Sequence, residues 1–206
     1  MKIHTKICGI TRSEDALKAA ALGVDALGFV FFAGSKRAIT PEAAKPIIQQ
    51  LPPFVSAVGL FVNETAENIQ KILQTVPLDI LQFHGDESPE FCRQFHRPYL
   101  KAVRVRSEAD VLDALEKYDD ARAVLFDAYV VGEYGGTGHA FDWTMLPDDL
   151  GARWILSGGL NVDNLAAALA QTGAVAVDVS SGVEQSAGVK SPELMAKFLS
   201  ICQSKT

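Results

Sequence analysis

The pattern of hydrophobic and polar positions alternates along the whole chain between short strand-like runs and longer helical segments. The short runs are rich in β-branched or aromatic residues, and each precedes a turn signal and a segment with helical spacing. The pattern predicts eight strands, at about residues 2–8, 26–31, 56–62, 79–84, 100–105, 123–128, 153–157 and 174–179. Repeated units of this kind indicate an α/β protein.

Capping residues mark the beginnings of several intervening helices. The predicted helical patterns are Ala16 to Leu22 after Ser13, Ala43 to Leu51 after Thr40-Pro41, Ile69 to Thr75 after Glu64-Thr65, and further helices after Ser88-Pro89 and Ser191-Pro192. The weakest pattern is 142–150, because it contains Pro147 followed by two aspartates.

Two folds fit eight alternating units: a closed (β/α)8 barrel and an open doubly wound sheet. An open sheet often carries G-x-G-x-x-G after its first strand, and the turn after Cys8 lacks that motif. Instead, reactive or polar side chains end most of the predicted strands, as the mouth of a barrel requires. They are Cys8, Asn63, His84, Arg104, Asp127, Ser157 and Asp178. We therefore predict a minimal-length (β/α)8 TIM barrel that forms one catalytic domain over residues 1–206.

Composition narrows the classes of ligand. The 206 residues are 48% hydrophobic, with a net charge of −6, so the chain can form a full core and has no basic surface for nucleic acid or anionic lipid. A small-molecule ligand is expected. The three cysteines show no spacing typical of zinc sites or disulfide frameworks, which favours a reducing cytoplasm. No secretory leader or membrane-spanning run is evident, so we expect a soluble, unprocessed protein, either a monomer or a homodimer.

Two loops that contain glycine and serine follow the seventh and eighth predicted strands. In barrels, phosphate binds at these two loops, where backbone N–H groups face the anion. The alternative is that the glycines are ordinary turn residues. The predicted phosphate-binding residues are Gly158, Gly159, Ser180, Ser181 and Gly182.

Asp127 ends the sixth strand and is a candidate general acid, since partial desolvation at a barrel mouth favours a protonated carboxyl group. The alternatives are a helix cap or a salt-bridge partner. A glycine-rich segment, 130–138, follows and is long enough to fold over a ligand, which favours a site.

Arg37 and His84 follow the second and fourth predicted strands. A guanidinium suits a planar carboxylate, although a solvated loop arginine is the alternative. For His84 a hydrogen-bonding role in the pocket wall is favoured over proton transfer.

Cys8 is either an inert buried residue or a reactive thiol. Lys6 lies two residues earlier on the same strand face, where its ammonium would favour the thiolate.

Five motifs occur in order along the chain. They are Lys6-Ile7-Cys8-Gly9-Ile10-Thr11, Leu81-Gln82-Phe83-His84-Gly85-Asp86-Glu87, Gly135-Gly136-Thr137-Gly138 with Phe141-Asp142-Trp143, Ser157-Gly158-Gly159-Leu160 and Asp178-Val179-Ser180-Ser181-Gly182-Val183-Glu184. Together they resemble the phosphoribosylanthranilate isomerase family of tryptophan biosynthesis, and the resemblance covers essentially the whole chain.

The resemblance implies a small (β/α)8 barrel and an Amadori rearrangement that needs no metal or cofactor. N-(5-phosphoribosyl)anthranilate would become 1-(2-carboxyphenylamino)-1-deoxyribulose 5-phosphate. By motif, Asp127 would protonate the furanose ring oxygen and Cys8 would remove the proton from C2′. Arg37 would bind the anthranilate carboxylate, and Asp178 would lie near the sugar hydroxyls or the phosphate.

Two departures from the family pattern concern loops. Relatives usually carry prolines where this chain has Ala33 and Val131, and their loss is expected to loosen both loops in the absence of ligand. The competing hypotheses are another phosphosugar isomerase, epimerase or synthase barrel and a non-catalytic phosphosugar-binding barrel. The presence of both Cys8 and Asp127 favours the isomerase.

Overall fold

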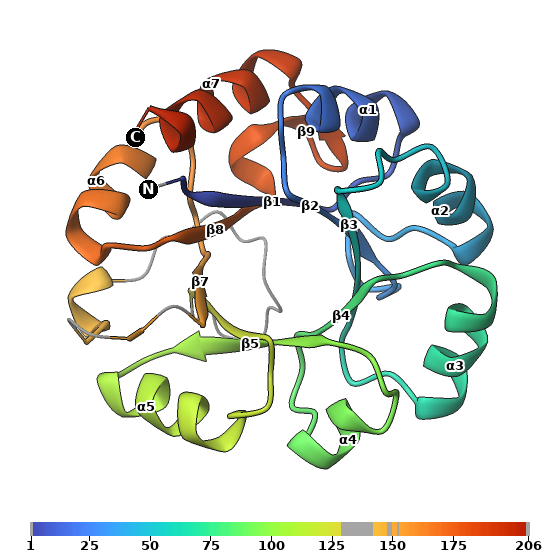
Figure 1. The fold of residues 1–206 in the computed structure, drawn as a ribbon, viewed down its shortest axis with the longest axis horizontal. Coiled ribbons are helices and arrows are strands. Elements are labelled where there is room, and N and C mark those ends of the chain that lie inside the picture. Colours follow the sequence, from blue (N-terminus) through green and yellow to red (C-terminus); the bar gives the residue numbers. More distant parts are fainter. Residues whose placement is uncertain (1, 129–141, 148–149, 152, 205–206) are drawn as a thin grey trace.

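Parallel strands β1 to β8 close into a barrel, and helices surround it (Figure 1). The computed structural model describes residues 2–128, 142–147, 150–151 and 153–204. The barrel strands are β1 (His4–Cys8), β2 (Ala26–Val30), β3 (Ser56–Phe61), β4 (Ile80–Phe83), β5 (Tyr99–Val105), β6 (Ala123–Ala128), β7 (Trp154–Leu156) and β8 (Ala176–Val179). Because β8 pairs with β1, the sheet has no open edge, and the predicted barrel is confirmed.

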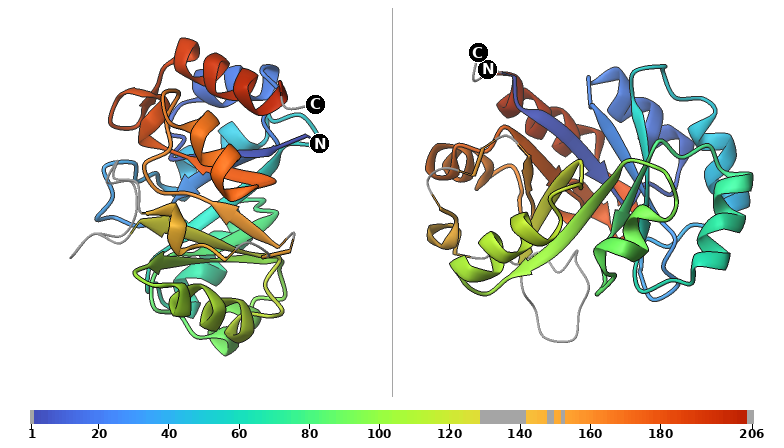
Figure 2. Two further views of the ribbon diagram at one scale, coloured as in Figure 1. Left: turned by 90° about the vertical axis from the view of Figure 1, so that its left-hand side faces the viewer. Right: turned by 60° about the horizontal axis from the view of Figure 1, so that its bottom comes forward.

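Seven α-helices cover the outside of the barrel in the part of the chain that the structure describes (Figures 1 and 2). They are α1 (Ser13–Ala21), α2 (Pro41–Ile48), α3 (Ala66–Thr75), α4 (Pro89–Arg93), α5 (Glu108–Lys117), α6 (Leu165–Thr172) and α7 (Pro192–Gln203). Thr40, Ser88 and Ser191 are confirmed as caps: each accepts a hydrogen bond from a backbone N–H of the first turn, and each precedes a proline. Ser13 is not a cap but the first residue of α1, and Arg12 at the N-cap makes no side-chain capping bond.

The segment between β6 and β7 differs from the prediction. Instead of a helix over 142–150, the described part of this segment contains a single 3-10 turn, η1 (Trp143–Met145), which Asp142 caps through the N–H of Thr144. Pro147 follows directly and cannot donate a helical hydrogen bond, which explains the early end. The predicted glycine-rich segment 130–138, with Val131, lies outside the described residues.

Side chains inside the barrel change in character from one end to the other. At the amino ends of the strands they are apolar, with Val58, Ile80, Leu100 and Ala123 packed together. Lys6, Gln82 and Asp178 are buried farther along their strands. Since parallel strands deliver alternate side chains to the interior, these polar groups rise toward the carboxyl ends, where barrel enzymes have their sites.

A short hairpin follows β8 and adds to the carboxyl-end rim. The 3-10 turn η2 (Ser181–Val183) leads into β9 (Glu184–Ser186), which pairs antiparallel with β10 (Val189–Lys190). Thr11 Oγ1 donates to the Gly188 carbonyl at 2.5 Å, and the Lys190 backbone N–H donates to Asp15 at 3.1 Å. These bonds attach the hairpin to the beginning of α1, beside the end of β1 (Figure 1).

No helix among the described residues is both long enough and apolar enough to cross a bilayer. The beginning of β1 and the end of α7 lie close together (Figures 1 and 2).

Candidate active site

A small pocket of about 60 Å³ lies at the carboxyl ends of the barrel strands. Most barrel strands, and the loops after them, contribute side chains to it. The lining residues are Cys8, Val30, Phe32, Ser35, Arg37, Leu60, Val62, Gln82, His84, Asp127, Ser157, Asp178 and Ser180. Apolar side chains from β2 and β3 form one wall, and polar groups form the other.

Six of the predicted site residues meet in this pocket: Cys8, Arg37, His84, Asp127, Asp178 and Ser180. Two residues of the predicted strand-end ring do not. The backbone N–H of Asn63 donates to Glu87 and its side chain contacts Asp86, while Arg104 pairs with Asp86 at 3.2 Å. Both therefore join loops at the rim, because their strand-end positions alone do not determine the side-chain direction.

Asp127 and His84 form a buried pair across the pocket. The distance from His84 Nε2 to Asp127 Oδ2 is 3.1 Å, and both side chains are less than a tenth exposed. The other ring nitrogen, Nδ1, lies 3.0 Å from Nε2 of the fully buried Gln82. The imidazole is thus held on both sides, which supports its predicted role in the pocket wall.

Lys6 lies between the thiol and an acid inside the barrel. Its ammonium donates to Asp178 Oδ1 at 2.9 Å and also interacts with Cys8. Burial opposes the charge, yet Asp178 and Cys8 outweigh it, so the pKa of Lys6 is raised. For Cys8 burial is the largest influence and raises the pKa of the thiol, while Lys6 opposes that rise. The predicted proximity is confirmed, but Lys6 offsets the burial only in part.

Gly28 makes room for this arrangement. It pairs with Cys8 across β1 and β2, and a Cβ at this position would lie 2.7 Å from Cys8 Sγ and 3.1 Å from Lys6 Nζ. Any larger residue would push the thiol or the ammonium out of place, so the sequence requires glycine on this inner face.

Arg37 is neither solvated nor free in this pocket. Its Nε and Nη2 donate to the two oxygens of Glu184, each at 2.8 Å, and the pair is mostly buried. The hydrogen bonds to Glu184 raise the pKa of Arg37. The aliphatic stem of Arg37 passes over Gly9, where a Cβ would lie 2.5 Å from Arg37 Cδ. Glu184 belongs to a quoted motif, but nothing local in the sequence indicates this partner 147 positions away.

The predicted phosphate loops lie side by side at the rim. Gly158 and Gly159 both have positive φ values, 83° and 63°, which turn the chain sharply after β7. A Cβ on Gly182 would overlap the Leu160 carbonyl oxygen, so the loops after β7 and β8 are in direct contact. The Ser180 hydroxyl donates to the Cys8 carbonyl at 3.0 Å and lines the pocket. Gly158, Gly159, Ser181 and Gly182 belong to these loops without lining the pocket itself.

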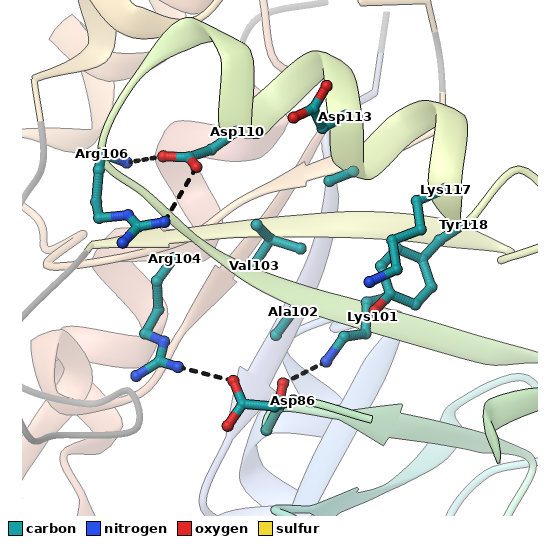
Figure 3. A pocket seen from close by; sticks show the side chains of 12 residues that line it. Asp86, Lys101, Ala102, Val103, Arg104, Arg106, Asp110, Asp113, Lys117 and Tyr118 are labelled. Carbon is teal, nitrogen blue, oxygen red and sulfur yellow. Dashed lines mark hydrogen bonds and ion pairs between the residues drawn. The ribbon is translucent and has the colours of Figure 1, made fainter. Parts of the chain in front are cut away.

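A larger cavity, about 430 Å³, lies between α5, β5 and the loop after β4 (Figure 3). Four of its charged groups form ion pairs: Arg104 with Asp86, and Arg106 with Asp110 (Figure 3). Lys101, which is 3% exposed, donates to Glu87 at 3.0 Å. We assign the site to the smaller pocket because it contains the thiol and the buried acid, whereas the carboxyl groups that line the larger cavity, Asp86, Asp110 and Asp113, are not buried.

Among the described residues, no group of three or more His, Cys, Asp or Glu side chains could hold a metal ion.

Three polar groups of the pocket region were not predicted individually: Gln82, Glu184 and Lys190. The first two lie within quoted motifs, so their polarity next to strand ends was a usable signal. Lys190 is a single lysine ten positions beyond Ser180, and no periodicity marks it.

Comparisons with known proteins agree on one family. The family model described as N-(5′-phosphoribosyl)anthranilate (PRA) isomerase matches residues 5–201. The N-(5′-phosphoribosyl)anthranilate isomerase of Neisseria meningitidis serogroup C is 57% identical over 198 residues, which cover 96% of this chain and 95% of the relative.

Solved structures give the same result. Phosphoribosyl anthranilate isomerase from Thermus thermophilus superimposes with a TM-score of 0.86 at 36% identity, covering 99% of this chain and 100% of that chain. A second phosphoribosyl anthranilate isomerase, in complex with reduced 1-(o-carboxyphenylamino)-1-deoxyribulose 5-phosphate, superimposes with a TM-score of 0.82 at 39% identity, covering 97% and 98% of the two chains.

Proposed function

The chain belongs to the N-(5′-phosphoribosyl)anthranilate isomerase family, and from this we propose that it converts N-(5-phosphoribosyl)anthranilate to 1-(2-carboxyphenylamino)-1-deoxyribulose 5-phosphate in tryptophan biosynthesis. The reaction is an aldose–ketose isomerisation by general acid and base. The solved relative that binds a reduced form of that ketose phosphate supports a small phosphorylated substrate.

Asp127 is the proposed general acid. Its carboxyl group donates a proton to the furanose ring oxygen as the C1′–O bond breaks, and the anthranilate nitrogen lone pair forms the C=N bond of a protonated Schiff base. His84 supports this role, since its Nε2, 3.1 Å from Oδ2, fixes the orientation of the carboxyl group. Burial of both groups limits competition from water.

Cys8 is the proposed general base. As a thiolate it takes the proton from C2′, and the C–H electron pair forms the C1′=C2′ bond while the C=N electrons return to nitrogen. The resulting enolamine becomes the ketone when C1′ gains a proton and the C2′ hydroxyl loses one. Lys6 supports the thiolate, because its ammonium interacts with Cys8 and opposes the rise of the thiol pKa that burial causes.

The rest of the rim is proposed to bind the two charged ends of the substrate. Arg37 holds the anthranilate carboxylate, and the loops with Gly158, Gly159, Ser180, Ser181 and Gly182 hold the phosphate. The pocket of about 60 Å³ has room for only the reacting part of the ribose, so the two charged ends lie on the surrounding loops. His84 and Asp178 contact the sugar hydroxyls from inside the pocket.

One observation carries the proposal: a thiol from β1 and a carboxyl group from β6 face the same buried pocket. A barrel that only sensed phosphosugars would need no such acid and base together.

The test is an anthranilate fluorescence assay with freshly prepared N-(5-phosphoribosyl)anthranilate, which is a labile compound. We expect fluorescence to change faster than in the uncatalysed control. An unchanged rate, with the phosphosugar still bound in a calorimetric titration, would support the sensor instead.

The location and assembly stay predictions. The three thiols, all buried and unpaired with one another, support a reducing cytoplasm. Sedimentation of the purified protein distinguishes the monomer from the homodimer.

A further inference from the structure

Lys190 and Glu184 are cross-strand partners in the β9–β10 hairpin. The Lys190 side chain is fully buried, and its ammonium has three acceptors: Glu184 Oε1 at 2.8 Å, the Cys8 carbonyl at 2.6 Å and the Ser180 carbonyl at 3.1 Å. An ammonium has three N–H donors and no acceptor, so this set matches the charged form. The single side chain therefore joins the end of β1, the proposed phosphate loop and the hairpin.

Glu184 connects this ammonium to Arg37. The same carboxylate that accepts from Lys190 accepts two hydrogen bonds from Arg37, through Nε and Nη2 at 2.8 Å each. A guanidinium has five N–H donors. Three therefore remain on Arg37, two on Nη1 and one on Nη2. One from each nitrogen forms the end-on edge, which binds a second carboxylate in bidentate fashion.

The link through Glu184 to Lys190 also sets the net charge around Arg37. An arginine whose only ionic partner is a glutamate forms a neutral pair, and a neutral pair attracts an incoming carboxylate weakly. With Lys190 included, the cluster contains two cations and one anion and keeps one positive charge in excess. The neighbouring Lys6–Asp178 pair is neutral, so it does not cancel this charge. In a mostly buried site such a charge acts strongly on a substrate anion.

We propose that Lys190 is a positioning residue for carboxylate recognition: acting through Glu184, it keeps the Arg37 cluster cationic and fixes the free guanidinium edge toward the aromatic carboxylate of the substrate. The proposal rests on the proposed function, because it assumes that Arg37 binds this carboxylate. It assigns to the hairpin a role in selecting N-aryl aminosugar phosphates that carry an acidic group over those that do not.

The experiment compares two ligands by calorimetry: reduced 1-(2-carboxyphenylamino)-1-deoxyribulose 5-phosphate and its analogue without the carboxyl group. The ratio of their Kd values measures carboxylate recognition separately from phosphate and sugar binding. We compare the wild type with Lys190→Gln, which removes the charge but keeps an N–H donor, and with the double variant Lys190→Gln/Glu184→Gln. Lys197→Gln, on the exposed face of α7, is the matched control.

The wild type and Lys197→Gln are expected to share one large ratio in favour of the carboxylate. Lys190→Gln should lower this ratio at least about tenfold, because the cluster becomes neutral. The double variant again leaves the Arg37 charge in excess, so its ratio should return to within about threefold of the wild type. An unchanged ratio in Lys190→Gln, or no recovery in the double variant, overturns the proposal.

Folding is checked by circular dichroism. If Lys190→Gln does not fold, the double variant decides: a ratio near that of the wild type supports the proposal and a ratio near one overturns it. Failure of both variants to fold also overturns it, in favour of a purely structural role. A wild-type ratio near one, together with no turnover, would instead contradict the proposed function.

Discussion

The imidazole of His84 holds the carboxyl group of Asp127, with 3.1 Å between Nε2 and Oδ2, and both side chains are buried. Gln82 controls which ring nitrogen carries the proton. When its amide N–H donates to Nδ1, Nε2 carries the proton and donates to an ionised Asp127. When the amide is turned over, its oxygen accepts from Nδ1 and a protonated Asp127 donates to Nε2. In the orientation described, Gln82 Oε1 has no hydrogen-bond partner among the described residues; turning the amide over pairs this oxygen with Nδ1 and leaves the NH2 group in its former place.

Replacing Asp127 should lower kcat more than replacing His84, which holds its carboxyl group. Asp127→Asn removes the proton donor and should lower kcat by about 10²- to 10⁴-fold, the usual contribution of positioned proton transfer. His84→Asn leaves the acid in place, so its loss of kcat should be clearly smaller. Steady-state fluorescence kinetics measures both, with circular dichroism as the control for folding. Equal losses in the two variants would make His84 a proton carrier.

The Lys6–Asp178 pair should be important for stability. Lys6→Met leaves the Asp178 carboxylate buried without its counter-ion, and breaking a buried pair in this way costs about 3–5 kcal/mol. Lys6→Met/Asp178→Asn removes both charges and should recover a large part of the loss. Urea unfolding at pH 7 gives the free energies. A loss below about 1 kcal/mol in the single variant would show that the pair is solvated.

Much of the fold could be predicted from the sequence. Runs such as 123–128, which is β6 in the structure, are short, apolar and bounded by turn residues, so local pattern determines them. Cap-then-proline pairs marked α2, α4 and α7 for the same reason. The helix predicted over 142–150 does not form, because Pro147 cannot donate the hydrogen bond that would continue it.

The site was predictable where a strand end, or the loop after it, determines the place of a side chain. Cys8 and Asp127 lie at the carboxyl ends of their strands and point inward by alternation, so position predicts proximity. Arg37 and Glu184 are brought together by a loop and a hairpin, and no local pattern encodes a contact across 147 positions. Lys190 was missed for the same reason.

Gly28→Ala should impair catalysis more than stability. The new Cβ would meet Cys8 Sγ at 2.7 Å and the Cys8 Cα at 3.0 Å, so the thiol must shift from the pocket. We expect kcat to fall at least about tenfold while phosphate inhibition is retained, since misplacement of a reacting group by about 1 Å is costly. Gly59→Ala is the matched control, because its Cβ would overlap Leu78 instead of a pocket residue. Equal kcat in both variants would contradict the account.

Arg37→Ala should separate the two charged ends of the substrate. It removes the proposed carboxylate partner and should raise the KM for N-(5-phosphoribosyl)anthranilate at least about tenfold, a typical result for a charged hydrogen-bonded contact. Inhibition by inorganic phosphate should be unchanged, because the phosphate loops follow β7 and β8. Parallel loss of both affinities would indicate that Arg37 stabilises the whole rim through Glu184.

The role of Cys8 as the base is the central claim, and the pH dependence of Cys8→Ala tests it most directly. Burial raises the thiol pKa above its ordinary 9.0, with Lys6 in opposition, so the thiolate fraction increases with pH through the neutral range and beyond pH 9. The kcat of the wild type should therefore rise toward alkaline pH, by up to about tenfold per pH unit below the pKa. Cys8→Ala should lose about 10²- to 10⁴-fold in kcat at pH 8 and show no such rise. A variant that keeps near-wild-type kcat, or the same alkaline rise, would contradict the account.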